Sequence, residues 1–178
     1  MPEQKYSPPI ASLLTKQSVS SLAERIAAQI GYVAGSDLQP IVEGMGGKVT
    51  YQDFWELDNS ASGSIRVEQE GEFEIFLGMH TSQDRDRFTI CHEIGHYVLH
   101  YLYRLTEDTK LGPMQAARYG ADRTEYEANW FAASFLMPST QFKESYQAAN
   151  GDIYVVAAQF KVSLTAALVR AKALGIGP

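Results

Sequence analysis

The chain has 178 residues, of which 45% are hydrophobic and 20% charged, an ordinary composition for a globular protein of one domain. Its formal net charge of −6 argues against a protein whose main task is to grip duplex DNA, because neutralising phosphates requires a surplus of lysine and arginine. Cys91 is the only cysteine, so no intramolecular disulfide can form, which is typical of a reducing cytosol. No stretch approaches the roughly 18 apolar residues that span a membrane, and the N-terminus lacks the apolar core of a signal peptide. We therefore expect a cytoplasmic protein with no membrane partner.

The first part of the chain predicts an arm followed by two helices. Residues 1–17 carry prolines and serines and are expected to form a flexible N-terminal arm, with a single domain over residues 18–178. Apolar residues at helical spacing predict helices over 18–30 and 37–45, and glycines follow both.

Three segments with alternating apolar residues follow, at 48–54, 64–68 and 72–77. Gly71 lies where a hairpin turn between the last two is needed. These segments predict a small antiparallel sheet.

His92, Glu93 and His96 form a His-Glu-x-x-His motif in the run RFTICHEIGHYVLH, on a helix expected to begin near Ser82 and to end near Tyr101. Residues four apart lie on one face of a helix, so the two imidazoles can point at one ion. Such a pair binds zinc, and the glutamate reaches the remaining coordination position, where a water is bound. The motif predicts a Zn²⁺ centre with His92 and His96 as ligands and Glu93 as the catalytic base. Zinc peptidases commonly have this order, a sheet followed by a His-Glu-x-x-His helix, and use it to place a substrate strand beside the metal.

A catalytic zinc site needs a third protein ligand, and His100 is the nearest histidine. It lies about 12 Å beyond His92 along a regular helix at ~1.5 Å per residue. No glycine breaks the helix between His96 and His100, as one does in metzincins. We therefore place His100 at the helix end or behind the ligands, as a residue that supports them rather than one that binds the metal.

The third ligand is expected on the next predicted helix, where Asp122, Glu125 and Glu127 compete. Glu125 and Asn129 are four apart, so both can face the metal helix. Glu127 points about 200° around the helix from Glu125 and is expected to face solvent or a loop. We predict Glu125 as the ligand and Asn129 as a residue that orients an imidazole from behind.

The segment 105–122 joins the two ligand-bearing helices and contains glycine, proline and few apolar anchors. This composition predicts a mobile flap over the metal.

Beyond Pro138 the chain is predicted to be helical, and its last two helices are capped by Asp152 and Ser163. The run QFKVSLTAALVRAKALG resembles the second half of a helix-turn-helix, with Ser163 capping the would-be recognition helix, which would suggest DNA binding. Only three basic residues lie there, however, and three apolar residues occupy expected core positions, so packing is the favoured interpretation; the apolar residues are Leu164, Ala167 and Leu168.

Two separated blocks resemble the signature of the ImmA/IrrE family of bacterial metallopeptidases. The first is RFTICHEIGH, and the second is EYEANWFAASFLMP, which contains Glu125 and Asn129. The resemblance covers roughly residues 18–174 and implies an α+β, zincin-like metallopeptidase fold with a small antiparallel sheet, a His-Glu-x-x-His helix and a helical C-terminal part. It also implies zinc bound by His92, His96 and Glu125. Cys91 departs from the alanine usual in the family, and we interpret it as a small buried apolar residue.

The resemblance further implies a zinc endopeptidase that cleaves a helix-turn-helix (XRE-type) transcriptional repressor. Cleavage would derepress an operon for stress, DNA damage, mobile elements or phage defence, and single-stranded DNA is a candidate activator by analogy. The alternative is a zinc-containing regulatory protein that binds its repressor partner without cutting it. The intact Glu93 favours the enzyme, because a structural zinc site has no use for a base beside an open coordination position.

Overall fold

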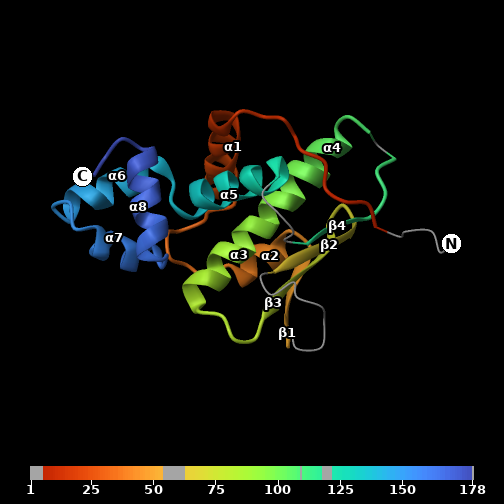
Figure 1. Ribbon diagram of the computed structural model, residues 1–178, viewed down its shortest axis with the longest axis horizontal. Helices are drawn as coiled ribbons and strands as arrows, with labels where there is room; N and C mark the ends of the chain where they lie inside the picture. Colours follow the sequence, from red (N-terminus) through yellow and green to blue (C-terminus); the bar gives the residue numbers. More distant parts are fainter. Residues whose placement is uncertain (1–5, 54–62, 109, 118–121, 178) are drawn as a thin grey trace.

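The C-terminal helices gather at one end of the molecule and a four-stranded sheet lies toward the other, with the helices α3 and α5 between them (Figure 1). The computed structural model describes residues 6–53, 63–108, 110–117 and 122–177. In chain order the elements are α1 (Lys16–Gln29), α2 (Gln39–Gly44), β1 (Gly47–Gln52), β2 (Ser64–Gln69), β3 (Glu72–Gly78), α3 (Gln83–His96), η2 (Tyr97–Leu102), α4 (Tyr103–Leu105), β4 (Met114–Ala117), α5 (Arg123–Leu136), α6 (Ser139–Ala148), α7 (Ile153–Phe160) and α8 (Leu164–Ala173). This architecture confirms the predicted α+β class.

The sheet is mixed rather than purely antiparallel. Its strand order is β1-β3-β2-β4, and β1 runs parallel to β3 while the other neighbours are antiparallel. The predicted hairpin between β2 and β3 is present, and Gly71 adopts a φ of 73° in its turn. The expectation for β1 was wrong because alternating apolar residues define the buried face of a strand and leave its neighbour and direction open.

Part of the predicted flap is an edge strand. Met114–Ala117 forms β4, pairs with β2 and buries the side chains of Met114 and Ala116. The flap prediction is therefore wrong for these four residues, and residues 109 and 118–121 lie outside the described part of the chain. A strand this short contributes only two buried side chains, which is too little for an alternating pattern to stand out.

The segment predicted as a loose arm contacts the domain. Ser7 forms a parallel bridge with Met114 at the outer edge of β4, and the hydroxyl of Tyr6 donates to Glu68 on β2. The first helix begins two residues before the predicted domain boundary, at Lys16, where Thr15 caps it by accepting from the backbone N–H of Ser18. The described residues of the arm thus belong to the domain.

The metal helix α3 begins as expected, since Ser82 accepts from the backbone N–H of Arg85. It does not end at Tyr101 or stay regular. The π-helical turn η2 follows His96, and α4 then extends the helix to Leu105. The assumption of an unbroken α-helix was wrong, and π-turns of this kind often occur at functional sites.

Helices α3 and α5 approach closely at Gly95. A Cβ added there would lie 3.1 Å from both the Cα of Ala128 and the Cβ of Phe131, and 3.2 Å from the carbonyl oxygen of Ala128. Two of these three atoms belong to the backbone of α5, which cannot move aside as a flexible side chain would. The absent side chain at Gly95 therefore sets the spacing between the two helices.

We predict that Gly95→Ala destabilises the fold by about 1 kcal/mol, because the overpacking cost exceeds the roughly 1 kcal/mol that alanine gains over glycine in a helix. Gly44→Ala is the matched control, since that exposed helical glycine has no atom within 4 Å of an added Cβ. Urea denaturation should therefore show opposite signs, with the control slightly more stable than the wild type. A stabilised Gly95→Ala variant would contradict the spacing argument.

The C-terminal helices are held to the domain by buried arginines. Arg170 on α8 donates to the carbonyl of Met137 at 2.9 Å and to the carboxylate of Glu24 on α1 at 2.7 Å. Arg87 on α3 donates to the carbonyl of Lys161 at 3.2 Å, in the turn between α7 and α8. One of the three basic residues considered for DNA binding is thus occupied inside the protein.

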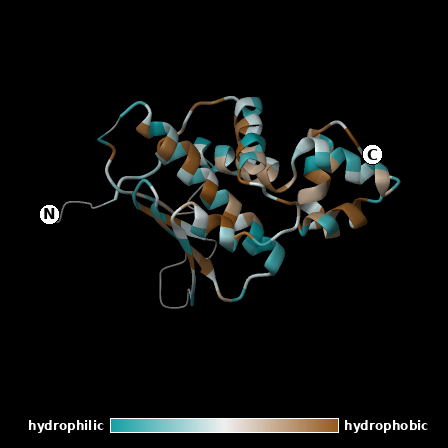
Figure 2. Cartoon of the chain, turned by 180° about the vertical axis from the view of Figure 1, so that it is seen from behind, coloured by the Kyte–Doolittle hydropathy of each residue, from teal (hydrophilic) through white to brown (hydrophobic). Residues whose placement is uncertain are grey.

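The hydrophobic α7, brown in Figure 2, and α8 form a bent pair. Ala167 is buried and Leu164 half-buried, but Leu168 is 43% exposed, so its assignment to the core was wrong. Among the described residues, no single helix is long and apolar enough to cross a membrane; α7 and α8 reach that length and composition only when joined, and their axes differ by 108°.

Candidate metal centre

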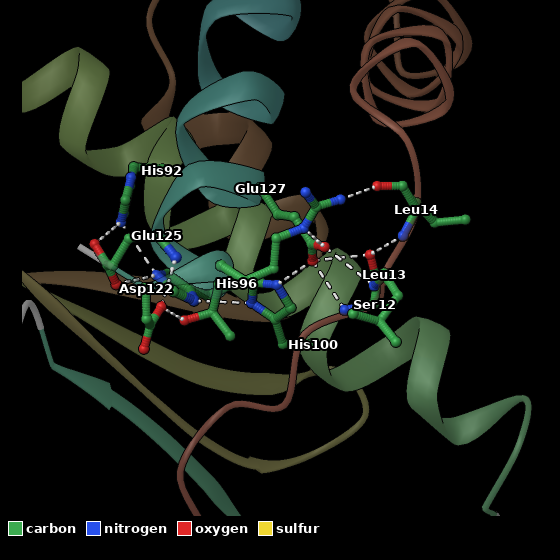
Figure 3. Close-up of polar contacts among 11 residues, drawn as sticks. Ser12, Leu13, Leu14, His92, His96, His100, Asp122, Glu125 and Glu127 are labelled. Atoms are coloured by element: carbon green, nitrogen blue, oxygen red, sulfur yellow. Dashed lines mark hydrogen bonds and ion pairs between the residues drawn. The ribbon is translucent and has the colours of Figure 1, made fainter. Parts of the chain in front are cut away.

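Three side chains from two helices converge beside the α3–α5 contact (Figure 3). The Nε2 atoms of His92 and His96 lie 3.1 Å apart. The carboxylate of Glu125 approaches both, with Oε2 3.3 Å from Nε2 of His92 and Oε1 3.1 Å from Nε2 of His96. Both imidazoles are buried, and the side chain of Glu125 is 12% exposed.

These spacings fit a tetrahedral zinc ion. Ligand atoms about 2.0–2.1 Å from zinc and separated by the tetrahedral angle lie about 3.3 Å from one another. The two Nε2 atoms are 3.1 Å apart, and each lies close to one oxygen of the Glu125 carboxylate, at 3.3 Å for His92 and 3.1 Å for His96. Two imidazoles and one carboxylate are also the donor set of a large class of catalytic zinc sites that keep a fourth position open.

Each imidazole has a hydrogen-bond partner behind it that sets its tautomer. The Nδ1–H of His92 donates to Oδ1 of Asn129 at 2.9 Å, as the four-residue spacing from Glu125 predicted. Nδ1 of His96 lies 2.9 Å from Nδ1 of His100. When Nδ1 carries the proton, the Nε2 lone pair is free for a metal. His100 therefore lies behind His96, a candidate ligand, and its 3.0 Å contact with Glu127 continues the chain of hydrogen bonds.

The two other candidate carboxylates have different partners. Asp122 caps α5 by accepting from the backbone N–H of Glu125 at 3.1 Å, and a hydrogen bond from Thr124 is the main cause of its lowered pKa. Glu127 points away from Glu125, as the helical angle required, but it is fully buried against Ser12 and not in solvent. Of the two expected surroundings, solvent or a loop, the structure has the loop, which is the N-terminal segment around Ser12.

The environment of Glu125 favours its charged form. Burial opposes ionisation, but hydrogen bonds and charge interactions with His92 and His96 outweigh it and hold the pKa well below its usual range. An ionised carboxylate is the form that binds a metal, so Glu125 is prepared for that role at neutral pH.

Glu93, the expected base, is buried under the residue that precedes β2. A Cβ added to Gly63 would lie 2.4 Å from Cγ2 of Thr89 and 3.2 Å from Oε1 of Glu93. Gly63 also adopts a φ of 101°, which side-chain-bearing residues rarely do. Only glycine fits over Glu93 at this point, and this is a feature that the sequence analysis did not identify.

Cys91 faces the core and not the metal centre. It is fully buried, and burial raises the pKa of its thiol far above the usual range. Its interpretation as a small apolar residue agrees with this environment, since the reactive thiolate is strongly disfavoured.

A profile of the M78 peptidases, described as an IrrE N-terminal-like domain, matches residues 45–172. The chain belongs to this family. The predicted ImmA/IrrE relationship is thereby confirmed, and with it a metallopeptidase family in general. A comparison with curated protein sequences returns no match. Among solved structures, a Mycobacterium tuberculosis transcriptional regulator is similar in fold, with a TM-score of 0.62 at 18% identity over 87% of this chain and 47% of the regulator. This chain therefore spans about half the length of that protein.

We predict that His92→Ala, His96→Ala and Glu125→Ala each lose the bound metal, because each removes one of three donors to a site that needs all of them. Elemental analysis of the purified variants measures this. Glu144→Ala removes an exposed helical carboxylate far from these donors in the sequence and should keep the metal of the wild type. Full metal content in Glu125→Ala would show that the wrong carboxylate had been assigned.

Proposed function

We propose that the protein is a zinc-dependent endopeptidase that cleaves a helix-turn-helix transcriptional repressor. The observation that carries the proposal is the set of three side chains whose donor atoms approach one another to 3.1–3.3 Å beside the buried Glu93. Family membership supports a metallopeptidase, and the choice of zinc follows from the donor set and its spacing.

The two histidines and Glu125 would hold the ion, with Asn129 and His100 fixing the orientation of the imidazoles. Zinc, when bound, would supply a Lewis acid that polarises the scissile carbonyl and lowers the pKa of a water. Glu93 takes a proton from the attacking water and delivers it to the nitrogen of the leaving amine. The enclosure of Glu93 by Gly63 and Thr89 keeps its carboxylate in one place for both transfers.

We predict that Glu93→Gln retains zinc and the fold but loses about 10²- to 10⁴-fold in cleavage rate, because glutamine keeps the shape of glutamate and cannot accept the proton. Metal content, thermal unfolding and single-turnover cleavage measure the three properties. Cleavage at the wild-type rate would remove Glu93 from the mechanism.

The repressor as substrate rests on the resemblance to the ImmA/IrrE family. The net charge of −6 supports a basic DNA-binding protein as the partner, because opposite charges accelerate and orient their encounter. Single-stranded DNA is the candidate activator. The alternative, a zinc-containing regulator that binds the repressor without cutting it, predicts a stable complex and no cleavage.

We expect the wild type to cut one helix-turn-helix repressor, encoded beside it, and to leave casein intact. The experiment incubates the two proteins with and without single-stranded DNA, and a chelator arm tests the metal requirement. Chelator-sensitive fragments of the repressor support the proposal. An intact repressor in every arm, together with co-purification of the two proteins, would favour the non-cutting regulator.

A further inference from the structure

Glu127 is a buried carboxylate surrounded by donors from three parts of the chain (Figure 3). Oε2 accepts from the backbone N–H of Ser12 at 2.8 Å, from the hydroxyl of Ser12 at 2.9 Å and from Nε2 of His100 at 3.0 Å. Oε1 accepts from the backbone N–H of Leu13 at 3.0 Å and from Nε of Arg123 at 2.8 Å. Both oxygens of Glu127 therefore act as hydrogen-bond acceptors.

The hydrogen bonds of Glu127 determine which ring nitrogens of His100 and His96 carry a proton. Both oxygens of Glu127 accept from N–H groups, so Nε2 of His100 also carries the proton in its contact with this carboxylate. When His100 carries this one proton, its other nitrogen, Nδ1, is an acceptor and lies 2.9 Å from Nδ1 of His96. Nδ1 of His96 must therefore donate to His100, which leaves the Nε2 lone pair of His96 facing Glu125.

The N-terminal segment adopts a costly backbone conformation to reach Glu127. Leu13 has a φ of 59°, in the left-handed region that leucine rarely occupies, and its side chain is 77% exposed. Packing of the leucine side chain does not explain this conformation. The conformation instead turns two successive backbone N–H groups, those of Ser12 and Leu13, toward the carboxylate as an anion-binding nest.

We propose that this nest, Ser12–Leu13, is a positioning element of the metal centre, holding Glu127 so that His100 and His96 keep the arrangement that binds metal. The proposal rests on the proposed function, since it assumes that His96 binds a metal. The nest lies outside residues 45–172, where the family profile matches. By linkage, a segment that strengthens metal binding must itself be held more firmly when the metal is bound.

A merely structural role for Glu127 predicts a different outcome. In that case the contact attaches the N-terminal segment to α5, and its loss lowers stability without changing the metal. Metal affinity of a folded variant separates the two, because supporting residues behind a metal ligand typically contribute 10- to 100-fold in affinity.

The test compares Leu13→Pro with Leu13→Gly in the full chain. Proline lacks the N–H and cannot adopt a positive φ, whereas glycine keeps the N–H and adopts this φ freely. We expect Leu13→Pro to bind zinc about 10- to 100-fold more weakly than the wild type, measured by competition with a chromophoric chelator, and Leu13→Gly to stay near the wild type. Circular dichroism of the metal-free proteins verifies that both are folded.

A second pair of variants tests the middle of the chain of hydrogen bonds. His100→Leu offers neither donor nor acceptor and should weaken zinc to a similar degree, whereas His100→Gln offers one of each and should restore part of the affinity. The double variant Leu13→Pro/His100→Leu should bind no more weakly than His100→Leu alone, because both act through one path. The visible spectrum of bound Co²⁺ should change in the same variants, since it reports the geometry of the ligands.

Equal zinc affinity in Leu13→Pro and the wild type would overturn the proposal, and so would additive losses in the double variant. If Leu13→Pro does not fold, Ser12→Ala replaces it, since it removes one donor to Glu127 and leaves the backbone intact. Wild-type affinity in Ser12→Ala and in His100→Leu would overturn the proposal in that case. Zinc binding is measured without substrate, so a protein that binds zinc and cuts no repressor would contradict the proposed function and leave this inference standing.

Discussion

The contact between α3 and α5 is the constraint on which the metal centre depends. Two donors lie on one helix and the third on the other, so the spacing of the helices determines the separation of the donors. Gly95 lies between His92 and His96 in the sequence, and its missing side chain lets α5 approach to the distance at which Glu125 meets both imidazoles. The contact between α3 and α5 thus determines both the packing of the core at this point and the geometry of the site.

Burying this many polar groups is costly unless each finds a partner. An unpaired polar or charged group in the interior loses its hydration without compensation. Asn129 satisfies His92, and His100 satisfies His96. Glu127 satisfies His100 and is itself satisfied by Arg123 and the N-terminal segment. From His96 the hydrogen bonds therefore extend outward until they reach Arg123, which is partly exposed.

The C-terminal helices are also held by buried charged side chains whose polar atoms have partners. Arg87 and Arg170 are long side chains whose guanidinium groups donate to backbone carbonyls at helix ends, where acceptors are otherwise unused. Arg170 also pairs with Glu24, which connects α8 to α1. These arginines attach the tail to the rest of the domain, and Arg170 is thereby removed from its surface.

The sequence by itself determined the local features of this protein. Helical spacing placed His92 and His96 on one face, and the same spacing aligned Glu125 with Asn129, because a periodic backbone converts sequence separation into direction. Capping residues such as Ser82 and Asp152 marked helix ends correctly for a similar reason, since a cap bonds to the backbone two or three residues away. Only the tertiary structure decided the parallel pairing of β1, the strand β4 and the partner of Glu127. Each of these joins residues far apart in the chain, and a local pattern shows which face of a segment is buried but not what covers it.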